Sequence, residues 1–199
     1  MNTIVKSFAD LDAEQKIAAV EMYTDREKDS SEDFFSEGVV EYYRETVLPE
    51  YGIDEAELQY SGFWSQGDGA SISTDSVDAE KFLRKIKALT KYRSIRHLLN
   101  EDDLAMSVER SHSRYAHENT VSGYIETAYT DLTVKQAALA DDLENVLTET
   151  IRELSCELYR ELEKAYDDYY STESMVNQIE GNGYQFEVNE DGDVVGIEY

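Results

Sequence analysis

Four side chains in two short polar segments could carry acid/base chemistry. The candidate catalytic residues are Asp68, His112, His117 and Glu118. Asp68 lies in a glycine-rich segment, and the other three lie within residues 111–118. A histidine beside a carboxylate can accept and return a proton near neutral pH, so the four form an acid/base set if the two segments are neighbours in the fold. The alternative is that His117 and Tyr115 form hydrogen bonds across the sheet and orient the turn, because buried polar groups need hydrogen-bond partners whether or not they do chemistry.

The same two segments supply the candidate binding residues. These are Trp64, Gln66, Asp68, Arg114 and Tyr115. An enzyme would hold several of them in one pocket, together with at least one titrating group whose pKa is strongly perturbed. A binding protein needs only that they share a surface.

The glycine-rich segment Ser65–Gly69 fits no known phosphate loop or nucleophile elbow. The patterns G-x-x-x-x-G-K-S/T, G-x-S-x-G and G-x-G-x-x-G before a helix are all missing, as is the calcium pattern D-x-D-x-D-G. His112 and His117 stand outside any zinc motif, so we expect no metal and no cofactor. The one cysteine, Cys156, lies on an apolar helical stripe and is expected to be an inert thiol in a reducing compartment.

Alternating residues predict the strands that position these segments. From residue 58 to 65 the side chains are expected to point alternately to the two faces of a strand, with Leu58, Tyr60, Gly62 and Trp64 on one face and Gln59, Ser61, Phe63 and Ser65 on the other. A turn is expected at 66–69, and residues 70–73 can return as the paired strand. A second antiparallel pair is predicted at 104–109 and 114–128, which gives a sheet of at least four strands. A terminal hairpin is predicted at 184–188 and 194–199, around an Asp-Gly turn.

Helical periodicity predicts the remaining elements. The expected helices cover residues 9–28, 32–48, 75–89, 91–99, 134–170 and 172–179. The helix at 134–170 is long enough to pack across the whole sheet or to project and dimerise. We therefore predict an α+β fold in which a small antiparallel sheet of hairpins packs against several helices.

We expect a single domain covering residues 1–199, because the sequence shows no internal repeat and no linker. Its parts are an acidic helical part at 1–52, a sheet with a basic helical insert at 56–128, and the long helix with the terminal hairpin at 133–199.

The charge is strongly negative and unevenly spread. The net charge is −26, with 16 acidic and 5 basic residues in 1–59, 17 and 3 in 138–199, but 3 and 7 in 75–96. Such a field repels nucleic acid and anionic membranes and attracts basic protein surfaces. The alternative is simple solubility or adaptation to high salt. The basic segment either docks against acidic helices or clamps an anion, and no stretch has the length and apolarity of a membrane span.

Several segments together resemble a family of small acidic proteins encoded by tailed bacteriophages. They are YSGFWSQGDGAS at 60–71, RYAHE at 114–118, LYRELEKAY at 158–166, YSTE at 170–173 and NGYQF at 182–186, with Gly52-Ile53 and Asp191-Gly192. Members are sometimes labelled antitoxin-like, and the resemblance carries over no catalytic residue. It implies a viral protein acting in the cytoplasm of the host cell. Ala116 and Asn119 depart from the serine and aromatic residue of the family pattern, which weakens a catalytic role for the His117 turn.

These observations leave three hypotheses. The leading one is a phage accessory protein that binds a basic host protein, as an anti-defence or host-takeover inhibitor with an acidic, DNA-mimicking surface as its special case. The second is a small enzyme with an acid/base site between the two turns. The third is a structural protein that forms homo-oligomers through the helix at 133–170.

Overall fold

The structure is a computed structural model that describes residues 3–29, 34–100, 104–111, 114–127 and 132–198. Its helices and small antiparallel sheets confirm the predicted α+β class. The chain forms two compact units, and each is described by itself. Unit 1 comprises residues 1–36 and 164–199, and unit 2 comprises residues 37–163. The organisation as a single domain stays a prediction.

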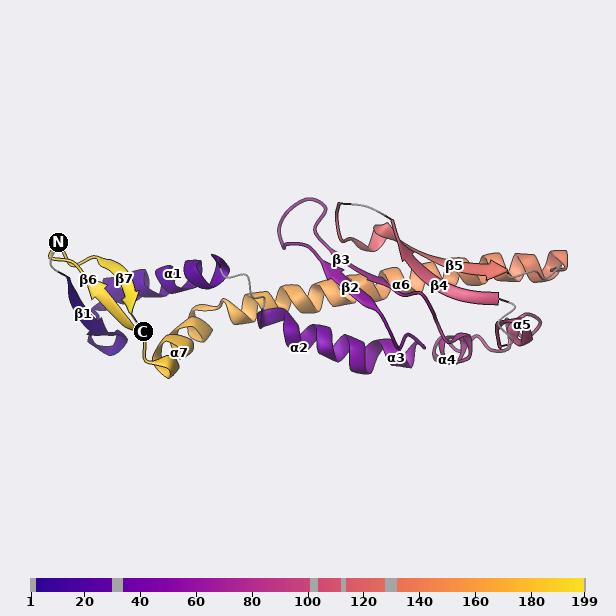
Figure 1. The fold of residues 1–199 in the computed structure, drawn as a ribbon, viewed down its shortest axis with the longest axis horizontal. Coiled ribbons are helices and arrows are strands. Elements are labelled where there is room, and N and C mark those ends of the chain that lie inside the picture. Colours follow the sequence, from indigo (N-terminus) through magenta and orange to yellow (C-terminus); the bar gives the residue numbers. More distant parts are fainter. Residues whose placement is uncertain (1–2, 30–33, 101–103, 112–113, 128–131, 199) are drawn as a thin grey trace. The chain divides into compact units, whose positions relative to one another are not determined.

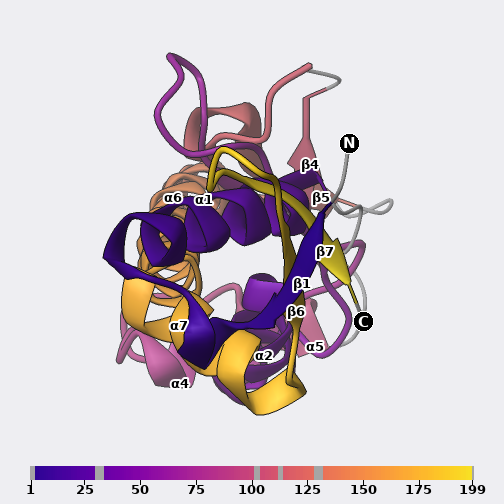
Figure 2. The ribbon, with the colours of Figure 1, turned by 90° about the vertical axis from the view of Figure 1, so that its left-hand side faces the viewer.

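Unit 1 is a three-stranded antiparallel sheet with two helices. Strand β6 (Gln185–Val188) lies between β1 (Ile4–Ser7) and β7 (Val194–Glu198), and helices α1 (Ala13–Asp29) and α7 (Thr172–Asn182) accompany the sheet (Figure 2). The terminal hairpin was predicted, whereas β1 was not. The buried core of the unit is formed by Phe8, Leu11, Ala19, Tyr23, Met175, Ile179, Phe186 and Val188.

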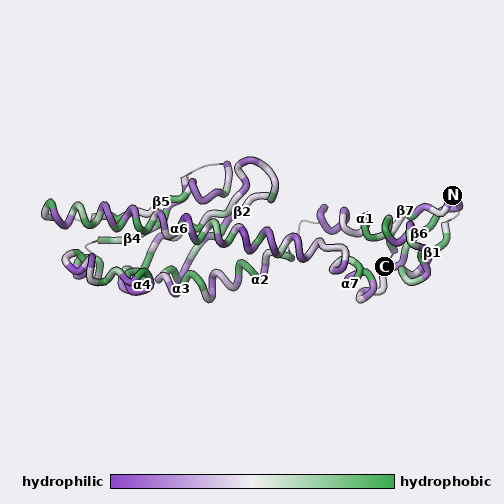
Figure 3. The backbone as a smooth tube through the Cα atoms, turned by 180° about the vertical axis from the view of Figure 1, so that it is seen from behind, coloured by the Kyte–Doolittle hydropathy of each residue, from purple (hydrophilic) through white to green (hydrophobic). Residues whose placement is uncertain are grey.

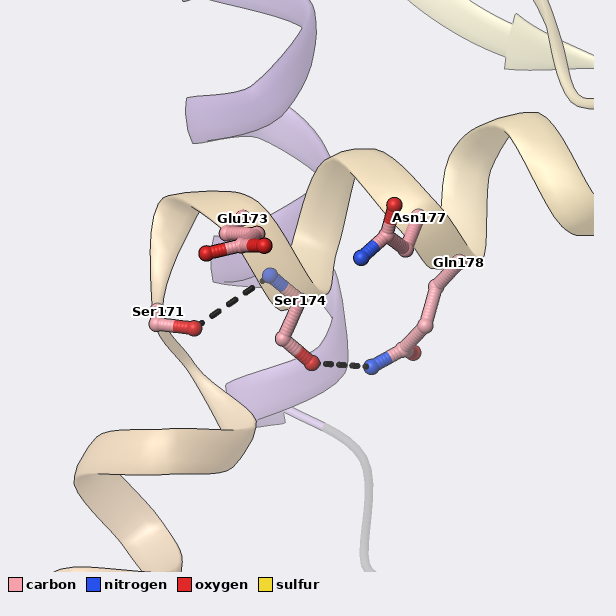
Figure 4. Close-up of a pocket in the computed structure, with 5 residues that line it drawn as sticks. All are labelled: Ser171, Glu173, Ser174, Asn177 and Gln178. Atoms are coloured by element: carbon pink, nitrogen blue, oxygen red, sulfur yellow. Dashed lines mark hydrogen bonds between the residues drawn. The ribbon is translucent and has the colours of Figure 1, made fainter.

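A shallow polar pocket lies at the start of α7. It is lined by Ser171, Glu173, Ser174, Asn177 and Gln178. Ser171 caps α7, because its Oγ accepts a hydrogen bond from the backbone N–H of Ser174 over 3.2 Å. The side-chain amide of Gln178 in turn donates to the Ser174 hydroxyl (Figure 4). The helix predicted to begin at residue 172 does begin there.

Unit 2 holds the remaining elements and most of the long helix. They are α2 (Phe34–Tyr42), a π-helical turn (Tyr43–Val47), α3 (Leu48–Glu50), β2 (Glu57–Tyr60), β3 (Ala70–Ser73), α4 (Ala79–Lys85), α5 (Arg96–Asn100), β4 (Leu104–Arg110), β5 (Val121–Thr127) and α6 (Val134–Tyr169). The first residues of α2 and the last six of α6 are counted in unit 1.

The strands of unit 2 form two antiparallel hairpins, β2–β3 and β4–β5. One isolated bridge joins them, in which Thr74 and Val108 exchange backbone hydrogen bonds of 2.9 and 2.8 Å. The prediction of a continuous sheet of four strands is therefore wrong. This bridge lies where the chain leaves β3, and just beyond it the N–H of Val77 donates to the carbonyl of Met106 over 2.9 Å before α4 begins.

Helix α6 covers the open edge of β5 and bonds to its backbone. The carboxylate of Glu144 accepts the N–H of Ile125, the hydroxyl of Thr148 accepts that of Gly123, and Arg152 donates to the carbonyl of Val121. Four residues of helix rise about 6 Å, close to the rise of two residues of strand, so the two registers match. Helix α6 is the longest helix drawn in Figure 1. Hydrophobic and hydrophilic stretches alternate along it (Figure 3), which lets one side pack while the other stays in water.

The basic segment is paired within unit 2, as one of the two interpretations of the sequence predicts. Its ion pairs are Lys81 with Asp54, Arg84 with Glu80, Lys85 with Glu50, Lys91 with Asp142 and Arg96 with Glu80. All lie at partly or fully exposed positions, where water and salt screen the attraction, so each adds little to stability. These basic side chains are used in neutralising acidic neighbours.

Candidate functional site

The glycine-rich segment forms a loop closed by its own hydrogen bonds, which we call the Trp64 loop (residues 61–69). At its base the N–H of Ser61 donates to the carbonyl of Gly69 over 3.0 Å, and the N–H of Gly69 donates to the Ser61 hydroxyl over 3.1 Å. At its tip the Asp68 carboxylate accepts the N–H of Ser65 over 2.6 Å. Strand β2 ends at Tyr60, so the predicted strand through Trp64 is too long. The predicted turn lies within the loop.

Phe63 anchors the Trp64 loop to the body of unit 2. Its side chain is buried and its ring stacks on Tyr159 of α6 at 5.6 Å and 24°. Tyr60 stacks on it at 6.4 Å and 25°, and the Tyr159 hydroxyl donates to the carbonyl of Gly62 over 3.3 Å. The loop is thus held by the buried ring of Phe63 and by hydrogen bonds at its base and its tip.

The side chain of Trp64 lies exposed to solvent on the loop that Phe63 anchors. Its side chain is 71% exposed, and its backbone has a φ of 109°, a region that favours glycine. Holding a residue other than glycine there costs about 1–3 kcal/mol. The ring of Trp64 packs edge-on against Phe63, with centroids 5.9 Å apart. The sequence suggested that Phe63 and Trp64 pack on opposite faces of a strand, but the first is buried and the second projects from a strained loop.

The two turns expected to form a site do meet. A Cβ placed on Gly69 would lie 3.0 Å from the Cα of His117, and one on Gly67 would lie 3.5 Å from the ring of Tyr115. The Ser61 hydroxyl also donates to the carbonyl of Ala116 over 3.4 Å. The first contact shows how closely the two turns approach, since a Cβ on Gly69 would press on the backbone of His117.

The candidate binding residues therefore lie on two turns of unit 2 that contact each other. Trp64 and Gln66 project from the loop, and the exposed side chains of Arg114 and Tyr115 belong to the turn that packs against it. Asp68 is only half-buried but is bonded within the loop. We call the exposed set of Trp64, Gln66, Arg114 and Tyr115 the Trp64 surface.

The catalytic candidates Asp68 and His117 accept hydrogen bonds from backbone N–H groups of their own turns. His117 Nδ1 accepts the backbone N–H of Asn119 over 3.1 Å, which places the ring proton on Nε2 in the neutral form. A Glu118 oxygen lies 3.0 Å from the same Nδ1 and attracts it only when that nitrogen is protonated. Within the described part of the chain, no hydrogen bond joins Asp68 to His117. His112 lies outside the described residues, so its role stays a prediction.

Cys156 has the properties of an unreactive thiol. Burial, and then the charge of Glu118, raise the pKa of the Cys156 thiol, while Arg160 opposes them. A raised pKa keeps the sulfur protonated and weakly nucleophilic. No group of three or more His, Cys, Asp or Glu side chains suited to a metal ion occurs among the residues that the structure describes.

Residues 35–172 match the model of a protein family described as a domain of unknown function (DUF8835). The chain belongs to this family. No curated protein and no solved structure matches the chain. Among the described helices, none combines the length and apolar character that crossing a bilayer requires.

The family segment contains the Trp64 loop, the turn at 114–118 and all of α6. It leaves out the three strands of unit 1. The loop holds the one tryptophan of the chain. The exposure and backbone strain of Trp64 were not predicted, because both depend on Phe63 taking the buried position.

Proposed function

We propose that this protein acts by binding another protein through the Trp64 surface, as a phage-encoded accessory protein that inhibits a basic host protein in the bacterial cytoplasm. The single observation that carries the binding role is Trp64, an exposed aromatic ring on a loop fixed in advance of binding. The phage setting rests on the resemblance of the sequence segments.

The geometry of the loop suits an interface anchor. Tryptophan, tyrosine and arginine are the residues that most often dominate binding energy at protein interfaces. Here Trp64, Tyr115 and Arg114 are exposed on adjoining turns. Because hydrogen bonds and the buried Phe63 already order the loop, little conformational entropy is lost on binding.

The net charge of −26 supports a basic partner. A field of this size speeds the approach of a positively charged surface, while the aromatic anchor provides short-range affinity. The basic segment does not cancel this field at a distance, since five of its side chains are already paired with acids.

Close imitation of DNA is the weaker form of the proposal. Exposed glutamates recur every four residues on α6, at Glu149, Glu153, Glu157 and Glu161. Their spacing along the axis is about 6 Å, whereas one DNA strand carries a charge about every 3.4 Å. The row is thus roughly half as dense, and exposed Arg160 interrupts it. General attraction to a basic protein needs no such match.

Affinity capture from phage-infected bacterial lysate at moderate salt tests the proposal. The wild-type protein is expected to retain a host protein that Trp64→Ala loses, because the variant removes the anchor. Tyr124→Ala, which removes another exposed aromatic ring of unit 2, is the matched control and should retain it. Recovery of the same proteins by Trp64→Ala, or of none by the wild type, would contradict the proposal.

Intrinsic fluorescence gives an independent measurement, since Trp64 is the only tryptophan. Its emission should be that of a water-exposed indole in the free protein and should shift to shorter wavelength when the purified partner is added. An unchanged spectrum at saturating partner would place the contact elsewhere.

A further inference from the structure

Gly38 lies in the interior of α2 although the fold of unit 2 gives no reason for a glycine there. A Cβ placed on Gly38 meets no atom within 4 Å, and its backbone φ is not in the left-handed region. Glycine in a helix interior costs about 0.5–1 kcal/mol relative to alanine. The helix bears this cost while keeping open space above its backbone.

The open space belongs to a groove with a mainly apolar wall. Its volume is about 560 Å³, and the residues on the α2 side are Gly38, Val39, Tyr42, Tyr43 and Val47. Tyr42 is 56% exposed, while Tyr43 is buried beneath it. The groove also spans the π-helical turn at 43–47, a local widening of the helix that is frequent at functional sites.

Two carboxylates form the opposite wall. Glu157 and Glu161 of α6 are exposed and lie one helical turn apart. Neither forms an ion pair with any residue that the structure describes. Burial, and then the charges of Glu157 and Glu161, raise the pKa of the Tyr43 hydroxyl to about 12, which agrees with both carboxylates facing the groove.

We propose that this groove binds an amphipathic basic helix of a partner protein. Apolar side chains of that helix would lie against Val39, Tyr42 and Val47, with its backbone close to Gly38. Lysine or arginine side chains four residues apart would face Glu157 and Glu161, because positions i and i+4 of a helix are separated by about 6 Å along its axis. An apolar stripe in a groove with charges at its rim is a common mode of helix recognition.

The groove goes beyond the proposed function because it lies apart from the Trp64 surface. Tyr159, which supports the Trp64 loop, and Glu161, which lines the groove, are two positions apart on α6. Their side chains therefore project about 160° apart around the helix axis. The two sites can be tested separately.

A labelled synthetic peptide of about 16 leucine and lysine residues, patterned as an amphipathic helix, is a suitable probe. Fluorescence anisotropy would measure its binding to the full chain. Gly38→Phe fills the groove and is expected to weaken binding about tenfold or more, a loss of about 1.4 kcal/mol. Gly181→Phe is the matched control, since Gly181 is an exposed glycine of α7 that also has open space around it. Equal affinity of the two variants would overturn the proposal.

A second pair of variants separates the groove from general charge attraction and guards against misfolding of Gly38→Phe. Glu157→Gln with Glu161→Gln should weaken peptide binding, whereas Glu149→Gln with Glu153→Gln, an equal charge change on the same helix, should weaken it at least threefold less. Equal losses, or equal binding of a scrambled leucine–lysine peptide, would overturn the proposal.

Two further measurements separate the two proposals and test whether a second copy of this chain fills the groove. Trp64→Ala should bind the peptide like the wild type even if it loses the captured host protein, so failure of one proposal is distinguishable from failure of the other. Light scattering that shows a wild-type dimer lost in Gly38→Phe would assign the groove to a second copy of this chain and overturn the proposal.

Discussion

At the scale of single residues, the strained backbone of Trp64 is expected to lower the stability of the fold while its side chain serves binding. Two residues other than glycine have positive φ, Trp64 at 109° and Lys87 at 58°, among the residues that the structure describes. Both are exposed, but their settings differ. Lys87 follows the end of α4, where glycine is the usual residue, whereas Trp64 sits at the tip of the proposed binding surface.

Glycine at either position is expected to raise the free energy of unfolding by about 1 kcal/mol, since the relief of strain exceeds the entropy that glycine loses on folding. Urea denaturation of Trp64→Gly and Lys87→Gly would measure it. Only Trp64→Gly should also abolish capture of the host protein. If Trp64→Gly is destabilised by more than Lys87→Gly is stabilised, the tryptophan ring has a structural role that outweighs the strain.

At the scale of elements, the packing of α6 on β5 depends on Gly123. A Cβ there would lie 2.7 Å from Cγ of Leu147, a separation that real Cβ atoms do not reach, and the N–H of Gly123 is bonded to Thr148. Gly123→Ala is therefore expected to lower the free energy of unfolding by about 1–3 kcal/mol, as overpacking does.

Leu147→Ala should destabilise by about 2–5 kcal/mol on its own, because Leu147 is fully buried. The double variant should be less destabilised than the sum of the two, since shortening Leu147 makes room for the new Cβ. Urea denaturation of all four proteins gives the coupling energy. Additive effects would show that the clash is relieved by movement of the helix instead.

The sequence predicted elements better than their connections. Periodicity located α6 within one residue of its observed end and also the start of α7, and an Asp-Gly turn signal located the terminal hairpin. Strand β1 was missed because Ile4–Ser7 has four residues and becomes a strand only by pairing with β6. The end of β2 was placed four residues late, because alternation cannot distinguish a strand from a loop that buries Phe63.

The site was predicted in part for the same reason. The meeting of the Trp64 loop with the turn at 114–118 could be stated only as a condition, since it depends on the bridge between Thr74 and Val108. The groove at Gly38 was not anticipated. A glycine in a helical pattern is visible in the sequence, but the open space above it is a property of the packed helices.

At the scale of the whole molecule, the buried tyrosines are expected to lower the stability of the fold at alkaline pH. Burial is the first cause that raises the pKa of the tyrosines with resolved shifts, which are Tyr23, Tyr43, Tyr92, Tyr159 and Tyr169. The value for Tyr43 is about 12, against about 10 in an unfolded chain.

Between these two values the folded state retains protons that the unfolded state has lost. The resulting stability is complete below about pH 10 and is lost as the pH rises toward about 12. Thermal unfolding followed by circular dichroism should show a falling midpoint across this interval, with a smaller fall in Tyr43→Phe. An equal fall in both proteins would assign the pH dependence to other groups.

The balance of charges predicts the response to salt. Ion pairs lose stability when salt is added and like-charge repulsion is relieved by it, so the sign of the change shows which effect is stronger. The ion pairs of the basic segment are exposed, so each contributes little to stability. Against them stand a net charge of −26 and the exposed glutamate row from Glu149 to Glu161, in which each neighbouring pair costs about 0.2–0.5 kcal/mol.

Repulsion between the acidic side chains outweighs the ion pairs, because it acts among all the unpaired acids whereas the ion pairs involve few side chains. Sodium chloride at about 1 M shortens the Debye length to about 3 Å. It is expected to raise the melting temperature by about 2–4 °C, equivalent to about 1 kcal/mol. Glu149→Gln with Glu153→Gln should melt higher than the wild type at low salt and gain less from salt. A melting temperature that falls with salt in the wild type would mean that the paired charges of the basic segment, and not the acidic surface, dominate the electrostatics of the fold.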